Sequence, residues 1–419
     1  MRNLILIVLI VFVLKYSIKK VFAADYHCTP GSKESPPSLI LKNHLFCMYE
    51  EDVRPVENKD QIVNVFLQLI PKFMEFGSRS STFTLHYWLK MKWTDNHLKW
   101  NPGEFQDVKR LHVLSNELWM PDFMIINTLD HFKLPSTTCV VQNTGNITCV
   151  WAIKTSVSCA SDYTYWPYDK QTCKFISASS TYQNHEVDFY FIDSGISMDD
   201  YALNHEWLMT RQEAERLVFT SSIYNYTEVT FEFDLKRHSR MAHSVFVTPA
   251  AILMLFTMTV LWLDSKSIER IILAGVNFVC HLFCIYDLHW MVPLNGLSIP
   301  HILVFYRDSL VLAAFALIMT IVFRKLQMIN TAAPNWIFFI VSILKDYRLA
   351  RFLVTSDQEL KDSCGSETEI EDSVESIQTV TVETNKEKTW SCFSTFMEWM
   401  SLFSIFITYL ILLATLIPK

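Results

Sequence analysis

Four long apolar segments in the second half of the chain constrain its fold more than any other feature. A helix needs about 20 mainly apolar residues to cross a bilayer, and the segments occupy residues 244–263, 271–286, 309–323 and 399–418. One or two buried helices of a soluble protein could imitate this pattern, but four clustered segments could not. We therefore predict four membrane spans.

The composition narrows the class of protein further. Half of the 419 residues are hydrophobic, 19% are charged and only 8 are glycine, which argues against a glycine-loop nucleotide-binding enzyme. The net charge of −7 argues against nucleic-acid binding. The sequence has no CxxC motif, no His/Cys cluster and no nucleophile–base arrangement. We expect no enzyme, no metal, no cofactor and no nucleic-acid partner, but contact with membrane lipid.

The first part of the chain has the character of a secreted domain. A charged start, an apolar run over residues 4–14 and a small-residue exit at Ala23 predict a signal peptide over residues 1–23. The alternative is an N-terminal anchor helix. Residues 24–240 alternate polar and apolar side chains, which predicts an extracellular domain of antiparallel strands. Three spans then fall within residues 241–325, and the fourth, with a short extracellular tail, falls within residues 395–419.

The predicted cytoplasmic loop, residues 326–394, has two parts. Residues 335–353 are apolar with scattered basic side chains and predict an interfacial helix. Residues 355–387 are rich in Asp, Glu, Ser and Thr and contain no aromatic residue, which predicts a disordered tether.

The cysteines and the glycosylation motifs support an extracellular location for the first domain. Six of the ten cysteines lie there, and an even number in an oxidising compartment favours disulfides. Cys139 and Cys149 flank a turn-rich hairpin, and Cys159 and Cys173 enclose thirteen residues, which leaves Cys28 and Cys47 as a third pair. Two glycosylation motifs begin at Asn146 and Asn225.

Several motifs resemble one family of membrane receptors. The loop between Cys159 and Cys173 contains Trp166-Pro167-Tyr168-Asp169 and resembles the Cys-loop of pentameric neurotransmitter-gated ion channels. Each motif is weak alone, but together they span about residues 39–418 and resemble a divergent, non-alpha nicotinic acetylcholine receptor subunit of invertebrate type. The other matching residues are Trp88-Leu89 with Trp93-Thr94-Asp95, Trp100-Asn101-Pro102, Trp119-Met120-Pro121-Asp122, Pro249, Glu269-Arg270, Pro293 and Pro300.

This resemblance implies a fold and a setting. The implied architecture is an extracellular, immunoglobulin-like β-sandwich with an N-terminal helix, followed by four membrane helices, with five subunits around a pore. The implied partners are other nicotinic-type subunits in a heteropentamer and a small cationic neurotransmitter such as acetylcholine. The implied location is the plasma membrane, on the postsynaptic side.

The resemblance also implies a ligand site built from aromatic side chains at subunit interfaces. Trp88 matches the key tryptophan of the family's complementary face, although a buried strand aromatic is the alternative interpretation. The principal face retains Tyr182 and Tyr226. Its other aromatic positions are occupied by Ile126, Ser180 and Val218, and its adjacent cysteine pair is replaced by Thr220-Ser221.

Two further groups of residues follow from the resemblance. The coupling region, which relays motion from the sandwich to the pore, would contain Trp166, Pro167, Asp169 and Arg237, with Asp169 and Arg237 as an ion pair. The pore would contain Glu269, Ile272, Val276, Val279, Phe283 and Asp287. Rings of Ile272 and Val276 would exclude water from the narrow end, whereas Glu269 would favour cations. The residues therefore favour a heteromeric channel subunit, with a non-conducting assembly subunit as the alternative.

Overall fold

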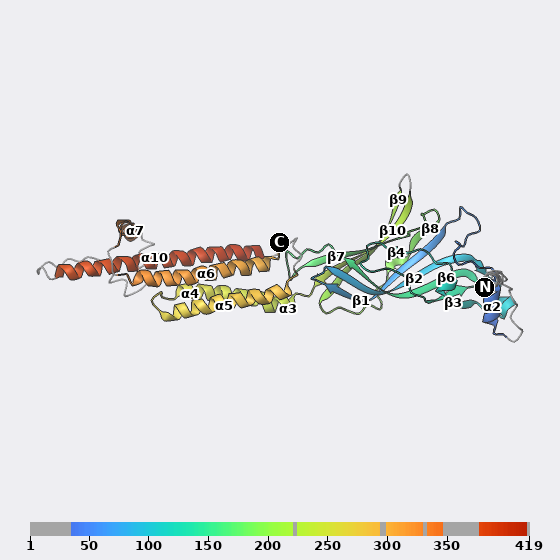
Figure 1. The fold of residues 1–419 in the computed structure, drawn as a ribbon, viewed down its shortest axis with the longest axis horizontal. Coiled ribbons are helices and arrows are strands. Elements are labelled where there is room, and N and C mark those ends of the chain that lie inside the picture. Colours follow the sequence, from blue (N-terminus) through green and yellow to red (C-terminus); the bar gives the residue numbers. More distant parts are fainter. Residues whose placement is uncertain (1–34, 221–223, 294–298, 330–332, 347–376, 417–419) are drawn as a thin grey trace, which may run out of the picture. The chain divides into compact units, whose positions relative to one another are not determined.

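The structure is a computed structural model that describes residues 35–220, 224–293, 299–329, 333–346 and 377–416. The chain forms two compact units (Figure 1). The first consists of residues 35–77, Ser81–Ala160 and Thr172–Leu235, and the second contains the long helices together with Ser78–Ser80 and Ser161–Gln171. The predicted signal peptide, residues 1–23, lies outside the described residues.

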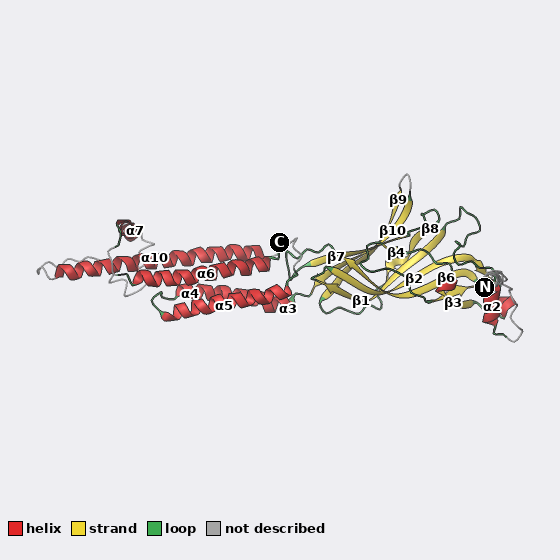
Figure 2. Cartoon of the chain, in the orientation of Figure 1, coloured by secondary structure: helices red, strands yellow, loops and turns green. Residues whose placement is uncertain are grey.

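The first unit is the predicted β-sandwich (Figure 2). Its larger sheet has the strand order β3-β5-β6-β2-β1-β8 and its smaller sheet the order β4-β7-β10-β9. Strand β1 pairs antiparallel with β2 and parallel with β8. The strands are β1 Val63–Gly77, β2 Thr82–Lys99, β3 Arg110–Leu114, β4 Met124–Ile125, β5 Thr138–Gln142, β6 Thr144–Ser158, β7 Lys170–Ala178, β8 Val187–Ile196, β9 Trp207–Thr220 and β10 Asn225–Arg237.

The two-residue period of the strands separates the core from the surface. On β2, Phe83, Leu85 and Leu89 are completely buried, whereas Trp88 between them is 45% exposed. The short helix α2, Pro37–Leu45, begins with a proline in its first turn and buries Leu41 against the same core. The exposed side chains of the larger sheet are therefore free to form a binding face.

Four helices in the second unit are long and apolar enough to cross a membrane: Arg240–Trp262, Ile268–Met291, His301–Gln327 and Thr389–Thr415. The first of these contains α3 Arg240–Ala242, the π-helical turn η3 His243–Val247 and α4 Thr248–Trp262. Pro249 lies two residues after the end of that turn, and a proline lacks the backbone donor that a regular helix would need there. The others are α5 Ile268–Met291, α6 His301–Gln327 and the C-terminal part of α10 Ile377–Leu416.

The region between the third and fourth spans contains the predicted helix but is helical in part of the predicted disordered tether. The helix predicted within residues 335–353 is present as α7, Asn335–Asp346, whose Ile337 is buried in a cluster with Cys392. The disordered tether predicted over residues 355–387 is wrong for its last part, because α10 already begins at Ile377. Composition alone predicted disorder there, but a helix that is already nucleated extends at little cost. Residues 355–376 lie outside the described residues.

A closed ring of buried hydrogen bonds joins all four spanning helices. Thr257 of α4 accepts from Asn277 Nδ2 of α5 at 3.0 Å, and the backbone oxygen of Asn277 lies 2.9 Å from His281 Nδ1. His281 Nε2 contacts Ser309 Oγ of α6 at 2.8 Å. Tyr409 of α10 completes the ring, with its hydroxyl 2.8 Å from Ser309 Oγ and 3.3 Å from Thr257 Oγ1. Asn277 Nδ2 and both ring nitrogens of His281 on α5 thus find partners inside the bundle, where unpaired polar groups are costly.

Candidate functional site

The tryptophan motifs of the first unit form the support for the candidate ligand face. Trp93 and Trp119 pack edge to face with ring centroids 6.5 Å apart. Asp95 is completely buried and accepts a hydrogen bond from the Tyr49 hydroxyl at 2.7 Å, while the Tyr49 oxygen accepts from the backbone N–H of Trp119 at 2.9 Å. Burial raises the pKa of the Asp95 carboxyl above its usual range. These motif residues therefore stabilise the interior of the sandwich through ring packing and buried hydrogen bonds.

Asp122, the last residue of the motif Trp119-Met120-Pro121-Asp122, organises the loop that carries Tyr182. Its Oδ2 accepts hydrogen bonds from the Ser179 hydroxyl at 3.0 Å and from the backbone N–H groups of Ser180 and Thr181, both at 2.8 Å. The Ser180 and Thr181 hydroxyls donate to the same oxygen. Partial burial opposes the charge of this carboxylate, but the hydrogen bonds from Thr181, Ser180 and Ser179 prevail and lower its pKa.

The lowered pKa of Asp122 predicts a loss of stability in acid. Because the folded-state pKa lies below the unfolded value of about 3.9, the stabilisation is complete above that value and disappears as the pH falls through the folded-state pKa. Asp122→Asn is expected to destabilise the chain at pH 7 and to flatten this part of the pH profile. Chemical denaturation of the purified full chain between pH 7 and pH 2.5 measures both effects. An unchanged pH profile in the variant would contradict the assignment.

The two tyrosines predicted for the principal face lie in different surroundings. The Tyr182 ring packs 6.2 Å from Trp119 at the edge of the core. Tyr226, on β10, stacks on Phe219 of β9 with ring centroids 5.1 Å apart and lies 6.3 Å from Tyr224. Within the described part of the chain, no ring contact joins Tyr182 to Tyr226. Phe219 and Tyr224 are aromatic residues that the sequence interpretation missed, although both flank the predicted position.

The substituted positions of the principal face are exposed and offer little to a cation. Ile126 is 54% exposed and Val218 is 48% exposed. Ser180 donates hydrogen bonds to Asp122 from both its backbone N–H and its hydroxyl. An aliphatic side chain lacks the ring quadrupole that attracts an ammonium group. The principal face of this chain is therefore poor in the groups that hold a quaternary ammonium.

Trp88, the predicted complementary-face residue, is exposed on the larger sheet, so the buried-aromatic alternative is not what the structure shows. Lys72 of β1 places its Nζ atom 3.7 Å from the centroid of the Trp88 ring, which is a cation–π contact. Lys72 also forms an ion pair with Asp200. The sequence analysis missed both residues, although Pro71 inside a strand was a signal of local irregularity.

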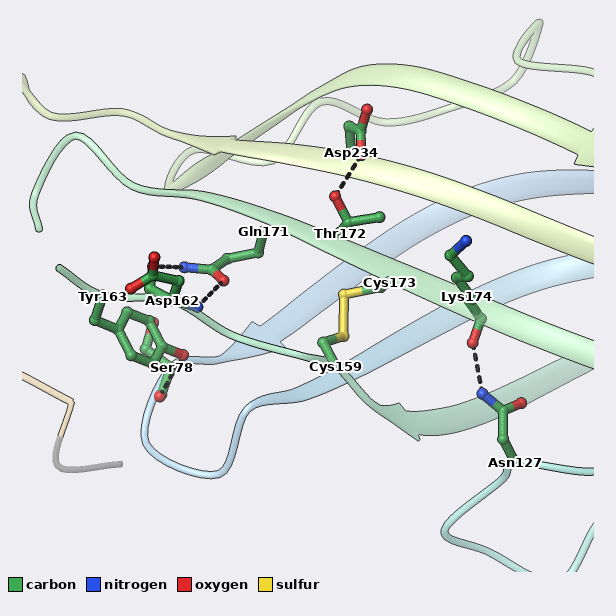
Figure 3. Close-up of a disulfide and its surroundings, with 10 residues drawn as sticks. All are labelled: Ser78, Asn127, Cys159, Asp162, Tyr163, Gln171, Thr172, Cys173, Lys174 and Asp234. Carbon is green, nitrogen blue, oxygen red and sulfur yellow. Dashed lines mark hydrogen bonds between the residues drawn. A yellow bond between two sulfur atoms is a disulfide. The ribbon is translucent and has the colours of Figure 1, made fainter. Parts of the chain in front are cut away.

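Two disulfides close loops in the sandwich. Cys139 and Cys149 are bonded across the β5–β6 hairpin, and Cys159 and Cys173 are bonded around the loop of thirteen residues. Figure 3 shows the second disulfide with the start of its loop, where Gln171 Nε2 donates to the backbone oxygen of Asp162 at 3.0 Å. The predicted third pair includes Cys28, which lies outside the described residues.

The enclosed loop lies in the second unit and carries the predicted coupling residues. Arg237 Nε donates to Asp169 Oδ1 at 2.8 Å, and Arg237 Nη2 donates to Ser78 Oγ at 2.9 Å. Gln171 Nε2 donates to the other oxygen of Asp169 at 2.9 Å. The Asp169 side chain is 1% exposed and the Arg237 side chain 8% exposed, so the ion pair is shielded from water.

The same loop contacts the first spanning helix and the start of α6. Trp166, which precedes Pro167, packs against Phe246 with ring centroids 5.4 Å apart. The Tyr168 hydroxyl lies 2.6 Å from His243 Nδ1. The backbone N–H of His301 donates to the Thr164 oxygen at 3.0 Å. Motion of the loop would therefore be transmitted to these helices through direct contacts.

The predicted pore residues share one exposed face of α5. Ile272 is 59% exposed, Val276 47%, Val279 46% and Phe283 66%, and Glu269 and Asp287 are also exposed. The opposite face, with Arg270, Ala274, Asn277 and His281, is buried in the bundle. Arg270 pairs with Glu398 of α10 at 3.3 Å and donates to the Leu263 oxygen at 2.7 Å. Helix α5 therefore has a mainly apolar exposed face and, on its opposite side, a mainly polar face that is buried in the bundle.

The two glycosylation motifs lie in different surroundings. Asn146 is exposed near the start of β6 and accepts a hydrogen bond from Thr94 at 2.9 Å. In the second motif Thr227 is 3% exposed and donates to Asp188 at 2.7 Å, and Asp188 is also paired with Arg216 at 2.7 Å. Asn225 itself is half-buried, so Asn146 is the more accessible of the two acceptors in the folded chain.

Comparison with known proteins relates this chain to one family. Residues 39–239 match the sequence profile described as "Neurotransmitter-gated ion-channel ligand binding domain". The first domain of this chain is therefore similar to the ligand-binding domain of the Cys-loop ligand-gated channels. It is 28% identical to the neuronal acetylcholine receptor subunit beta-3 of Rattus norvegicus over 66% of this chain and 62% of that protein. It is 29% identical to the subunit alpha-5 of Rattus norvegicus over 71% of this chain and 67% of that protein.

Similarity to the Cys-loop family supports several broader predictions. Family members are ligand-gated ion channels and not enzymes. The matching domain and the four apolar helices describe a multi-pass protein of the plasma membrane, with its N-terminal domain outside the cell. The chain spans about 62% of the length of the beta-3 relative that it matches.

Proposed function

We propose that this chain is a subunit of a neurotransmitter-gated cation channel and works in a heteropentamer with other nicotinic-type subunits. In such an assembly it contributes a complementary face centred on Trp88, one fifth of the pore lining and the Asp169–Arg237 coupling pair. The ligand is a small cationic neurotransmitter such as acetylcholine, and the relatives named for acetylcholine receptors support that choice.

The observation that carries this proposal is the asymmetry between the two candidate ligand faces. Trp88 presents an exposed ring on the larger sheet, whereas the principal-face positions hold Ile126, Ser180 and Val218. A subunit that can offer only one half of an interfacial site needs a neighbour of different sequence for the other half. The exposed, apolar face of α5 also supports a heteromeric assembly, because five identical copies would exclude water from the pore.

Co-expression tests the proposal directly. The chain alone in oocytes is expected to give no acetylcholine-evoked current. Together with an alpha-type subunit it is expected to give currents whose single-channel conductance or agonist sensitivity differs from those of the partner alone. A robust current from this chain alone, or co-expressed currents identical to those of the partner, would overturn the proposal.

A second candidate function is a non-conducting assembly subunit, which the apolar pore face favours. Ile272 and Val276 occupy positions where typical members carry small hydroxyl residues, and both are exposed here. In that case co-expression raises the surface amount of the partner subunit but leaves its single-channel conductance unchanged. Surface biotinylation and single-channel recording from the same cells separate the two functions.

A further inference from the structure

Lys72 lies at an irregularity in β1. Ile70 pairs with Trp88 and Pro71 with Tyr87, but the register then shifts so that Phe73 pairs with His86. Lys72 is the extra residue at this point, which makes it the residue of a β-bulge. A proline cannot donate to a sheet ladder and is found within strands at edges or bulges. Lys72 lies two residues after Ile70, the partner of Trp88, so the two-residue period of the strand puts Lys72 and Trp88 on the same face as diagonal neighbours.

A second segment holds the lysine ammonium over the ring. The chain that follows β8 is fastened to β1 by hydrogen bonds from Ser197 N–H to the Leu69 oxygen at 3.0 Å and from Ala202 N–H to the Lys72 oxygen at 2.8 Å. This segment carries Asp200, whose carboxylate pairs with the Lys72 ammonium. Tyr201 packs against the core beside it, and burial raises the pKa of Tyr201 to about 12. The counter-charge of Lys72 is therefore placed by an anchored segment.

We propose that Lys72 is a built-in ammonium group that competes with cationic ligands for the Trp88 ring, with Asp200 as its fixed counter-ion. The inference rests on the proposed function insofar as Trp88 faces a ligand. A quaternary ammonium that approaches the occupied ring face meets a like charge at the position it needs, 3.7 Å from the ring centroid. To bind, it must displace Lys72 from both the ring and Asp200. Lys72 thus lowers the affinity of this face for quaternary ammonium ligands such as acetylcholine without abolishing their binding.

Binding of tetramethylammonium to the purified full chain in detergent tests the inference without requiring a working channel. Lys72→Met keeps the length of the side chain and removes its charge, and it is expected to raise the affinity about 2- to 30-fold, the range of a cation–π contact. Lys72→Arg retains a cation and is the matched control, with no gain expected. The double variant Lys72→Met with Trp88→Leu is expected to lose the gain, because the freed ring is then absent.

Several results decide the matter. Equal affinity in Lys72→Met and the natural chain, or a gain that persists without Trp88, would overturn the inference. Lys72→Gln serves as a second neutral variant if Lys72→Met does not fold. In co-expressed receptors Lys72→Met is expected to lower the half-maximal acetylcholine concentration by a similar factor. If co-expression shows no contribution of this chain to the current, the proposed function fails, while tetramethylammonium binding still decides the role of Lys72.

Discussion

Replacing Asp169 with alanine is expected to destabilise the folded chain by about 3–5 kcal/mol. The cause is the charge left behind: Arg237 has a side chain that is only 8% exposed, and its Nε and Nη2 atoms would lose their carboxylate partner. Gln171 would lose an acceptor at the same site. The expected result is a lower unfolding temperature of the purified full chain and less protein at the cell surface.

A matched control is available on the surface of the sandwich. Lys174 and Glu232 form an ion pair at 2.7 Å, but their side chains are 52% and 26% exposed. Glu232→Gln is expected to cost no more than about 1 kcal/mol, because solvent screens the pair. Comparable losses in Asp169→Ala and Glu232→Gln would show that burial does not give the Asp169–Arg237 pair its importance.

A double variant separates stability from signalling. Asp169→Leu combined with Arg237→Met removes both charges and is expected to recover much of the lost stability, as apolar replacements of buried ion pairs often do. If the pair also relays motion, these channels reach the surface in co-expression but respond weakly to agonist. Full recovery of both surface expression and agonist response would limit the pair to a structural role.

Polar substitutions on the exposed face of α5 are expected to produce the second large effect. Ile272→Thr with Val276→Ser replaces two apolar rings by hydroxyl groups, which lowers the cost of keeping water and ions in the pore. Conductance of co-expressed channels should rise about tenfold for each 1.4 kcal/mol by which the permeation barrier falls. Single-channel recording measures this directly.

The control for the pore variants lies on a different helix. Val311 of α6 is 62% exposed in the isolated chain, so Val311→Ser introduces a similar hydroxyl without touching α5. It is expected to leave the conductance unchanged. If Ile272→Thr and Val276→Ser also change nothing, while the surface expression of the partner still depends on this chain, the assembly function is the correct one.

The sequence predicted features that depend on local pattern or on matching motifs. The spans follow from apolar runs, and the Cys159–Cys173 loop follows from spacing. The contact of Lys72 with Trp88 could not be predicted, because it depends on the register in which β1 pairs with β2, and that register is not written in either strand alone. The start of α10 at Ile377 was not predicted, because the composition of a polar segment does not show whether an adjoining helix extends into it.

The polar ring of the bundle shows a different limit of sequence interpretation. Asn277 and His281 interrupt an otherwise apolar span, but which hydroxyl groups meet them depends on the rotation and packing of four separate helices. Asp122 presents the same problem in the sandwich. Its motif was recognised, yet its role in ordering Ser179, Ser180 and Thr181 comes from contacts nearly sixty residues away along the chain.

The polar ring also has a consequence for how the protein is made. Its last member, Tyr409, meets Ser309, a residue 100 positions earlier in the chain. At about 5–20 residues per second, the ribosome needs about 5–20 s to synthesise the stretch between them. During that interval the first three helices are already available to the insertion machinery, while the hydroxyl that closes the ring does not yet exist. The hydrogen-bond ring can therefore close only after the fourth span has been synthesised.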